Sequence, residues 1–238
     1  MCAIISDMPA GSIRARVRAE MTAEIKAVAR RHLETEGANL SLRAVARDMG
    51  MVSSALYRYF GSRDELLTAL ILDAYNALGA TVEAADAGVA DRSKLRERWL
   101  AAAHAIRGWA LANPAEYALL FGSPVPGYAA PQDTIAAAAR TPVVLVGILA
   151  DGFAAGALAS QPALRFELTA QVRAEIADAR DYIAPGLPEE LMVAGVAAWV
   201  QLFGTVSFEL FGQFNNVIFA RTEFFDQQMR LMADLMGL

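Results

Sequence analysis

Three short helical segments, each followed by a glycine, open this sequence and restrict the folds available to it. Residues 14–36 place apolar side chains at steps of three and four, as on one face of a helix, and Gly37 follows them. Residues 42–49 form a second, shorter segment that ends at Gly50, and residues 53–60 form a third. Two short helices joined by a tight, glycine-containing turn predict a helix-turn-helix.

The starts of these helices carry capping residues. Ser41 precedes the second helix and can cap its N-terminus. Ser62 and Glu65 stand three residues apart, which is the capping-box spacing, at the start of a fourth helix that we expect to run to about Val82. Because free backbone N–H groups at helix N-termini attract phosphate oxygens, Ser41 and Ser62 mark two expected contacts with a nucleic-acid backbone.

Charge is distributed unevenly along the chain. Residues 1–63 contain ten Lys and Arg against six Asp and Glu, a formal charge of +4, whereas residues 64–238 carry −9. A basic end on an acidic body suits a protein that presents that end to phosphates. Three arginines, Arg14, Arg16 and Arg18, begin the first helix; they form either an ordinary solvated helix start or an arm that reaches phosphate or the minor groove.

The third segment has the composition of a recognition helix. Such a helix is short, polar where it faces the major groove and apolar where it packs. Ser53 and Ser54 open it, and Leu56 supplies an apolar anchor. Tyr57 and Tyr59 offer hydroxyls that can reach bases or phosphates. The alternative is that both rings pack in the small core of the domain.

The run from Ser41 to Leu67, SLRAVARDMGMVSSALYRYFGSRDELL, resembles the TetR family of bacterial transcriptional regulators. Ala46 in the bracing helix, Gly50 in the turn and the LYRYF sequence that closes the recognition helix match the family pattern. Arg63 stands where lysine is usual, which keeps the charge but changes the geometry of a phosphate contact. Residues 113–128, NPAEYALLFGSPVPGY, are similar, more weakly, to one branch of the family's C-terminal domains.

The resemblance implies that seven side chains of this region bind DNA. These residues are Ser41, Arg43, Ser53, Ser54, Tyr57, Tyr59 and Arg63. The tyrosines would contact phosphate, Ser53 and Ser54 would approach bases or backbone, and the other three would hold the backbone or the groove edge. The resemblance also implies a homodimer on a palindromic, double-stranded DNA operator, and a C-terminal domain that binds a small-molecule effector.

The rest of the chain predicts a larger helical body. Alanine and leucine dominate it, so we expect an all-α fold in which a long fourth helix joins head and body. We expect a disordered arm over residues 1–13, a helix-turn-helix domain over 14–63, and a ligand-binding and dimerisation domain over 64–238. The single cysteine, Cys2, cannot form an internal disulfide, and the N-terminus lacks the basic segment of a signal peptide. Both features predict a cytoplasmic protein.

Two apolar stretches raise the alternative of a membrane protein. Leu191–Phe208 is eighteen mostly apolar residues long, but Gln201 interrupts it and basic flanks are missing. Asp151 interrupts the other stretch, Pro142–Ala159. Helices buried within a protein assembly explain both stretches better, so we expect no membrane partner.

An effector pocket needs apolar walls and a few polar groups, which the body can supply. The candidate lining residues are His104, Trp109, Tyr117, Phe121, Tyr128, Phe153 and Trp199. Trp109, Tyr117 and Phe121 are favoured because they flank a loop rich in Pro and Gly over residues 122–131, where helices separate. The alternative is that these side chains are ordinary core residues.

The last two predicted helices, residues 189–211 and 223–236, carry apolar side chains around most of their circumference. We expect them to form a four-helix bundle with the same helices of a second copy. The predicted dimer contacts are Val196, Val200, Phe203, Phe225, Met229 and Met232.

Together these features predict a repressor that a small apolar or amphipathic ligand releases from DNA. The alternatives are an activator, a ligand-independent repressor, or a helical ligand-binding body whose head no longer regulates transcription. Cys2, His32 and His104 lack metal-ligand spacing, and the sequence has no phosphate-binding loop or nucleophile motif. We therefore expect no metal, no cofactor and no catalytic activity. His32 itself is expected at the surface or edge of the first helix.

Overall fold

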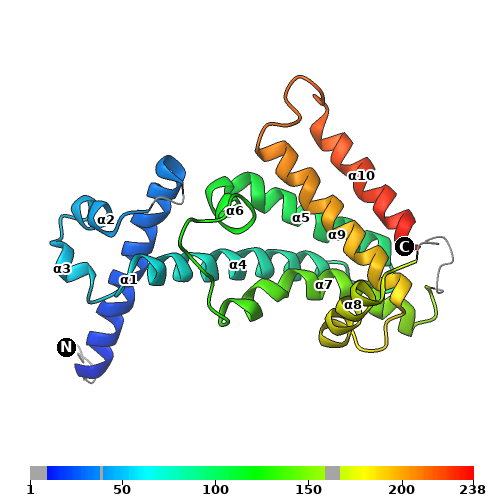
Figure 1. Cartoon of the computed structure of the whole chain (residues 1–238), viewed down its shortest axis with the longest axis horizontal. Helices are drawn as coiled ribbons and strands as arrows, with labels where there is room; N and C mark the ends of the chain where they lie inside the picture. Colours follow the sequence, from blue (N-terminus) through cyan, green and yellow to red (C-terminus); the bar gives the residue numbers. More distant parts are fainter. Residues whose placement is uncertain (1–9, 38–39, 159–166) are drawn as a thin grey trace, which may run out of the picture. The chain divides into compact units, whose positions relative to one another are not determined.

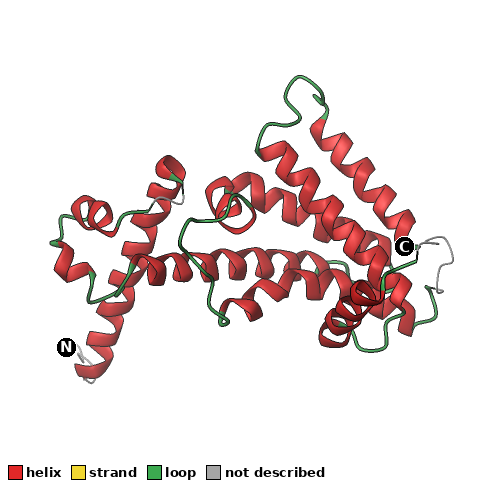
Figure 2. Ribbon diagram, viewed as in Figure 1, coloured by secondary structure: helices red, strands yellow, loops and turns green. Residues whose placement is uncertain are grey.

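A computed structural model describes residues 10–37, 40–158 and 167–238, and over these ranges the chain forms helices and no strands (Figures 1 and 2). The predicted all-α fold is confirmed. Its helices are α1 (Ala10–Glu36), α2 (Leu42–Asp48), α3 (Ser53–Leu56), α4 (Arg63–Ala87), α5 (Leu95–Ala112), α6 (Pro114–Phe121), α7 (Thr134–Ala154), α8 (Ala170–Ile183), α9 (Glu189–Leu210) and α10 (Arg221–Met236). Residues 1–9 of the predicted arm lie outside the described residues, and its last residues, from Ala10, already belong to α1.

Two compact units make up the chain. The head unit contains the residues up to Asp73 together with 115–131, and the body unit contains residues 74–114 and 132–238. The chain therefore passes from one unit to the other three times: within α4, at the start of α6 and after Pro131. The border predicted from the sequence for the DNA-binding domain, after residue 63, falls at the first residue of α4.

The head unit is built on a small aliphatic core. Its buried residues come from α1, α2, α3, the first turns of α4 and the segments that join these helices: Ile25, Val28, Ala29, Leu33, Leu40, Leu42, Val45, Ala46, Leu56, Phe60, Leu66, Leu67 and Leu70. Because Leu66, Leu67 and Leu70 face this core, the start of α4 is part of the head. The apolar steps read from the sequence thus correspond to real packing faces.

Local caps fix the ends of the head helices. The Ser41 hydroxyl accepts a hydrogen bond from the backbone N–H of Ala44 at 3.4 Å, and Ser62 does the same for Glu65 at 3.1 Å. The carboxylate of Glu65 reaches back to the backbone N–H of Gly61 at 2.7 Å. The reciprocal bond of the capping box therefore ends one residue before the cap, and the α4 N-terminus remains well satisfied.

The segment after α5 folds onto the head core. Ala115, Leu119, Val125 and Tyr128 pack against it, and the Tyr128 and Thr68 hydroxyls lie 2.9 Å apart. Val125 and Tyr128 belong to the loop rich in Pro and Gly that the sequence predicts to lie beside an effector pocket, whereas Ala115 and Leu119 lie in α6. The apolar side chains of this segment explain the arrangement, because folding onto the head core removes them from water.

The body unit is organised around α9, which packs against α5, α7, α8 and α10. α9 and α10 lie side by side as an antiparallel pair (Figure 1). The largest fully buried side chains of this unit include Trp99, Phe225, Ile106, Ile148 and Leu149. α8 differs from the other body helices in that none of its side chains is fully buried.

Buried ion pairs tie the body helices together. The Arg98 side chain is only 2% exposed and binds Asp86 and Asp151, each at 2.8 Å, which joins α4, α5 and α7. Burial opposes the charge of Asp86, but hydrogen bonds from Arg98 and Arg92 outweigh it and lower the pKa of Asp86 below its usual value. Arg107 makes a two-bond pair with Glu209, both bonds 2.7 Å long.

Two body helices are long and apolar enough to cross a membrane, α7 and α9. About two fifths of each apolar window is buried inside the protein, 39% in α7 and 44% in α9. Pro142 lies inside α7, which begins two turns earlier, at Thr134. Both helices pack against several others of the body unit, as core helices do.

Candidate DNA-binding interface

A tight turn joins α2 to α3. Gly50 has a positive φ of 67°, a conformation that side chains rarely adopt, and its N–H bonds the Arg47 carbonyl at 3.0 Å. The next residue, Met51, donates to the Ala46 carbonyl at 2.8 Å, which closes the turn. The turn therefore orients α3 relative to α2, as a helix-turn-helix requires.

α3 is buried on one side and exposed on the other. Leu56 is fully buried and Phe60 is 6% exposed, whereas Ser54 and Tyr57 are exposed and Ser53 is partly exposed. The regular helix ends at Leu56, and residues 57–59 continue as a tighter turn. We had expected helix to residue 60; the difference arises because the N–H groups of residues 58 and 59 bond the carbonyl three residues back.

The two predicted tyrosines occupy different environments. The Tyr57 side chain is 47% exposed, whereas Tyr59 packs partly against the head core. The Arg18 guanidinium lies over the Tyr59 ring, 5.2 Å from its centroid. Tyr57 is thus exposed enough to reach a phosphate, while Tyr59 combines an exposed edge with a structural role.

Arg63 and Ser41 lie close to each other although 22 positions separate them. The Arg63 Nε donates to the carbonyl of Leu40 at 3.1 Å, immediately before the Ser41 cap of α2. This bond brings the N-termini of α2 and α4 together, and both present backbone N–H groups. Arg43, in the first turn of α2, is exposed.

One exposed apolar side chain at this surface was not predicted. Val52, just before α3, is 70% exposed, which is unusual for valine beside a small core. Apolar contact with a thymine methyl group is one of the ways in which a recognition helix reads the major groove. Its position immediately before Ser53 is the sequence signal that could have identified it.

His32 departs from its prediction. Its side chain is buried, 7% exposed, and its Nε2 lies 2.8 Å from the Asp48 carboxylate. This hydrogen bond is the main cause that lowers the pKa of Asp48. A polar side chain on the inner face of α1 is tolerated because Asp48 of α2 supplies a hydrogen-bond partner. The spacing of apolar residues along α1 does not reveal a partner on another helix.

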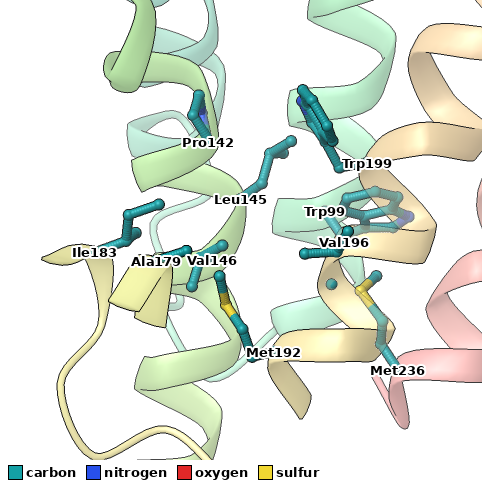
Figure 3. Close-up of a pocket in the computed structure, with 11 residues that line it drawn as sticks. Trp99, Pro142, Leu145, Val146, Ala179, Ile183, Met192, Val196, Trp199 and Met236 are labelled. Atoms are coloured by element: carbon teal, nitrogen blue, oxygen red, sulfur yellow. The ribbon is translucent and has the colours of Figure 1, made fainter. Parts of the chain in front are cut away.

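The body unit contains an apolar cavity of about 230 Å³ (Figure 3). Its walls come from α5, α7, α8, α9 and α10: Trp99, Pro142, Leu145, Val146, Ala179, Ile183, Met192, Gly195, Val196, Trp199 and Met236. None of these lining residues is charged, and the Trp99 indole N–H already donates to the Met229 carbonyl at 2.8 Å. The cavity therefore offers a guest shape and apolar contact but no charge.

Of the seven predicted pocket residues, Trp199 lines this cavity. Tyr117, Phe121 and Tyr128 belong to the head unit, where the ring centroids of the first two lie 4.9 Å apart with the ring planes tilted by 46°. The other three lie elsewhere in the body unit. His104 faces Asp226 at 3.2 Å, Trp109 is 9% exposed in α5, and Phe153 is 37% exposed near the end of α7. The folding of residues 115–131 onto the head explains where the loop aromatics lie.

The six predicted dimer residues divide into two groups. Phe203, Phe225 and Met229 are buried inside the body unit, because α9 and α10 turn these side chains toward each other and toward α5. Val196 lines the cavity, Met232 is half-buried and Val200 is 57% exposed. The apolar side chains that α9 and α10 leave exposed are Trp199, Val200, Phe208 and Leu231.

A basic helix-turn-helix head joined to a larger helical body defines a DNA-binding transcriptional regulator. Comparison with known families agrees with this class. Residues 25–70 match the bacterial regulatory proteins of the tetR family, and residues 99–232 match the tetracyclin repressor-like C-terminal domain. This chain belongs to the TetR family.

Two curated relatives support the assignment over nearly the whole chain. The HTH-type transcriptional regulators Rv1816 of Mycobacterium tuberculosis (strain ATCC 25618 / H37Rv) and Mb1846 of Mycobacterium bovis are each 40% identical over 229 residues. Each alignment covers 94% of this chain and 95% of the relative. Transcriptional regulators of this family are generally not enzymes. Membership of the family implies a soluble, cytoplasmic protein.

Solved structures share the fold. Regulatory protein SCO4313 superposes with a TM-score of 0.75 at 36% identity, covering 94% of this chain and 98% of that one. The TetR family transcriptional regulator PfmR from Thermus thermophilus superposes with a TM-score of 0.55 at 22% identity, covering 87% and 96%. The second likeness concerns the fold alone.

Proposed function

We propose that this protein is a homodimeric repressor that binds a palindromic operator and leaves it when a small apolar molecule enters the body unit. The observation that carries the proposal is the polar, exposed face of α3, held in place by a packed head core. TetR regulators bind DNA and typically form dimers, which supports the two coarser parts. Repression, the palindrome and the effector are our proposals.

On DNA, α3 would enter the major groove and the neighbouring helix ends would hold the backbone. Ser53, Ser54 and Val52 face outward at the start of α3, where base edges are read. Tyr57 and Arg63 would bind phosphates on either side, and Ser41, Arg43 and the exposed edge of Tyr59 would extend that contact. Neutralising several phosphates makes the affinity fall steeply with salt.

The exposed apolar stripe on α9 and α10 supports dimerisation. Val200, Phe208 and Leu231 are each more than half exposed, which is costly for apolar side chains in water. Gly204 lies on α9 between Val200 and Phe208, and nothing stands within 4 Å of the place where its Cβ would be. A second α9 can therefore approach closely at this point, in the manner of a four-helix bundle.

The cavity in the body unit supports a neutral, apolar effector. Its walls provide no cation or anion to pair with a charged guest, and burying an unpaired charge costs several kcal/mol. Burying one apolar group is worth about 1.5–3 kcal/mol. A hundredfold release from DNA needs about 2.7 kcal/mol of differential affinity per dimer. One apolar guest supplies that amount when the DNA-bound conformation lacks its contacts in the cavity.

The covalent path between the units supports control of the head by the body. The chain passes between the two units three times. Residues 115–131, which leave the body after α5 and return to it before α7, pack on the head core through Leu119, Val125 and Tyr128. A change in the spacing of α5 and α7 in the body would pull on both ends of this segment, and a tilt of α4 would move its first turn with Arg63. The two heads of a dimer would then no longer match two half-sites.

Selection of bound DNA from a random pool tests the proposal. The expected result is a two-fold symmetric motif with half-sites one helical turn apart or somewhat more. The recovered site placed before a reporter gene should lower expression, whereas increased expression would make the protein an activator. 1-Octanol should release the site and shift the fluorescence of Trp99 and Trp199, while octanoate, with the same chain and a charge, should not. Equal effects of the two would contradict a neutral cavity ligand.

A further inference from the structure

The C-terminal end of the recognition helix is held by a side chain from α1. The Arg18 Nη2 donates to the backbone carbonyl of Arg58 at 3.0 Å. The same guanidinium lies over the ring of Tyr59, 5.2 Å from its centroid. One side chain thus grips two consecutive residues that lie 40 and 41 positions further along the chain.

This grip matters because α3 has few other anchors. The regular helix is four residues long, and Val52 before it supplies no side-chain cap. Between residues 53 and 60 only Leu56 and Phe60 are buried. A short helix that is fixed by one apolar side and one end can tilt about that side, so a contact at its C-terminal end restricts its direction.

The electrostatics of the contact are favourable. The carbonyl groups at the end of a helical turn carry the negative end of its dipole, and a cation stabilises them. A guanidinium also binds the face of an aromatic ring, which an ammonium does less specifically. Arg18 therefore satisfies the Arg58 carbonyl, which has no further helical turn to bond, and fixes the plane of the Tyr59 ring.

We propose that Arg18 is a positioning residue for DNA recognition: it sets the angle at which α3 enters the major groove, and it does not act as a phosphate contact. The proposal rests on the DNA-binding function proposed above. It also distinguishes Arg18 from Arg14, one helical turn earlier on the same exposed start of α1.

The test compares Arg18→Ala with Arg14→Ala in the full-length protein. Each variant removes one positive charge from the start of α1, but only the first removes the grip on α3. The probes are the duplex recovered by selection and a shuffled duplex of equal length and composition, titrated between about 50 and 200 mM salt. Arg18→Ala should lose about tenfold in affinity for the selected duplex, the size expected when a charge-assisted hydrogen bond is lost.

The shuffled duplex separates positioning from phosphate binding. A positioning role predicts that Arg18→Ala equals Arg14→Ala in affinity for this duplex and in salt slope, because both variants lose one charge and keep the proposed phosphate contacts of Tyr57 and Arg63. A direct phosphate contact predicts weaker binding to both duplexes and a slope smaller by about 0.9. The second pattern, or an Arg18→Ala variant that behaves like Arg14→Ala on the selected duplex, overturns the proposal.

Hydrogen exchange without DNA gives an independent reading. Arg18→Ala should speed amide exchange over residues 53–60 and leave the buried face of α1, residues 25–33, unchanged. Faster exchange throughout the head would make Arg18 a general stability residue and refute the positioning role. Failure of the wild-type protein to select any DNA would instead refute the proposed function, and this exchange experiment would still decide whether Arg18 holds α3.

Discussion

The head and the body of this protein differ in the interactions that hold their helices together. The head uses a small aliphatic core and part-buried ion pairs, such as Lys26 with Asp73 at 2.7 Å. The body buries the charged side chains of Arg98 and Glu209, contains an apolar cavity and leaves apolar side chains exposed on α9. Buried charges, an apolar cavity and an uncovered apolar stripe are costly, and they are the features that a unit needs if a ligand and a second copy are to act on it.

The largest expected effect concerns the exposed stripe of the body. Val200→Asp places a charge in the proposed dimer contact, so the variant should sediment as a monomer and bind the selected duplex more than about a hundredfold more weakly. Val172→Asp changes another exposed valine, on α8, and should stay dimeric. Sedimentation at micromolar concentration measures both. A wild-type protein that is itself monomeric at this concentration would contradict the proposal that the exposed stripe forms a dimer contact.

Removing a buried ion pair of the body should lower the free energy of unfolding more than removing a part-buried ion pair of the head. Arg98→Met leaves Asp86 inside the body with one partner fewer and should lower the free energy of unfolding of the body by about 2–3 kcal/mol. Asp73→Asn breaks part-buried ion pairs of the head and should cost less than about 1 kcal/mol. Urea unfolding, monitored by hydrogen exchange in each unit, assigns each loss of stability to the head or to the body. Equal losses would erase the contrast between the units.

Filling the cavity should affect ligand release and leave DNA binding intact. Ala179→Phe extends a ring from α8 into the cavity and should weaken binding of 1-octanol about tenfold or more. Ala174→Phe adds the same ring to the exposed side of α8 and serves as the matched control. Titration against Trp fluorescence measures both. An unchanged octanol affinity in Ala179→Phe would place the effector elsewhere.

Acid should weaken the body through Asp86, by the smallest effect of the series. Its folded pKa lies below the ordinary value of 3.8, so the stabilisation by its charge is complete above about pH 4–5 and is lost as the pH falls through the folded pKa. The gap in unfolding free energy between wild type and Asp86→Asn should therefore narrow below about pH 4. Urea midpoints from about pH 7 to pH 3 test this, and a constant gap would mean that the charge contributes nothing.

The same contrast explains what the sequence could predict. The head follows from local rules: apolar steps of three and four, the Ser41 and Ser62 caps and Gly50 in the turn all act within a few residues of themselves. The chain ends its recognition helix at Leu56 because of tight local bonds that a periodicity argument does not resolve. Arg18 reaches a partner 40 positions away, and no local pattern announces such a partner.

In the body the decisive contacts are long-range. Tyr117 and Phe121 are predicted as pocket residues because they flank a loop rich in Pro and Gly, but both belong to the head unit, and the loop packs on the head core through Val125 and Tyr128. Phe225 and Met229 are predicted as dimer contacts from the apolar sequence of their helix, but they are fully buried between α10 and its neighbours. Composition correctly indicated an apolar, helical body; which side of each helix faces inward depends on partners distant in sequence.

The central claim is that the head reads DNA sequence and does not merely bind its charge. The most direct measurement is the affinity for the selected duplex and for its shuffled counterpart over the same range of salt. Our account predicts a preference of about a thousandfold or more for the selected duplex at physiological salt, and a steep loss of affinity for both as salt rises. Equal affinity for the two duplexes would contradict it.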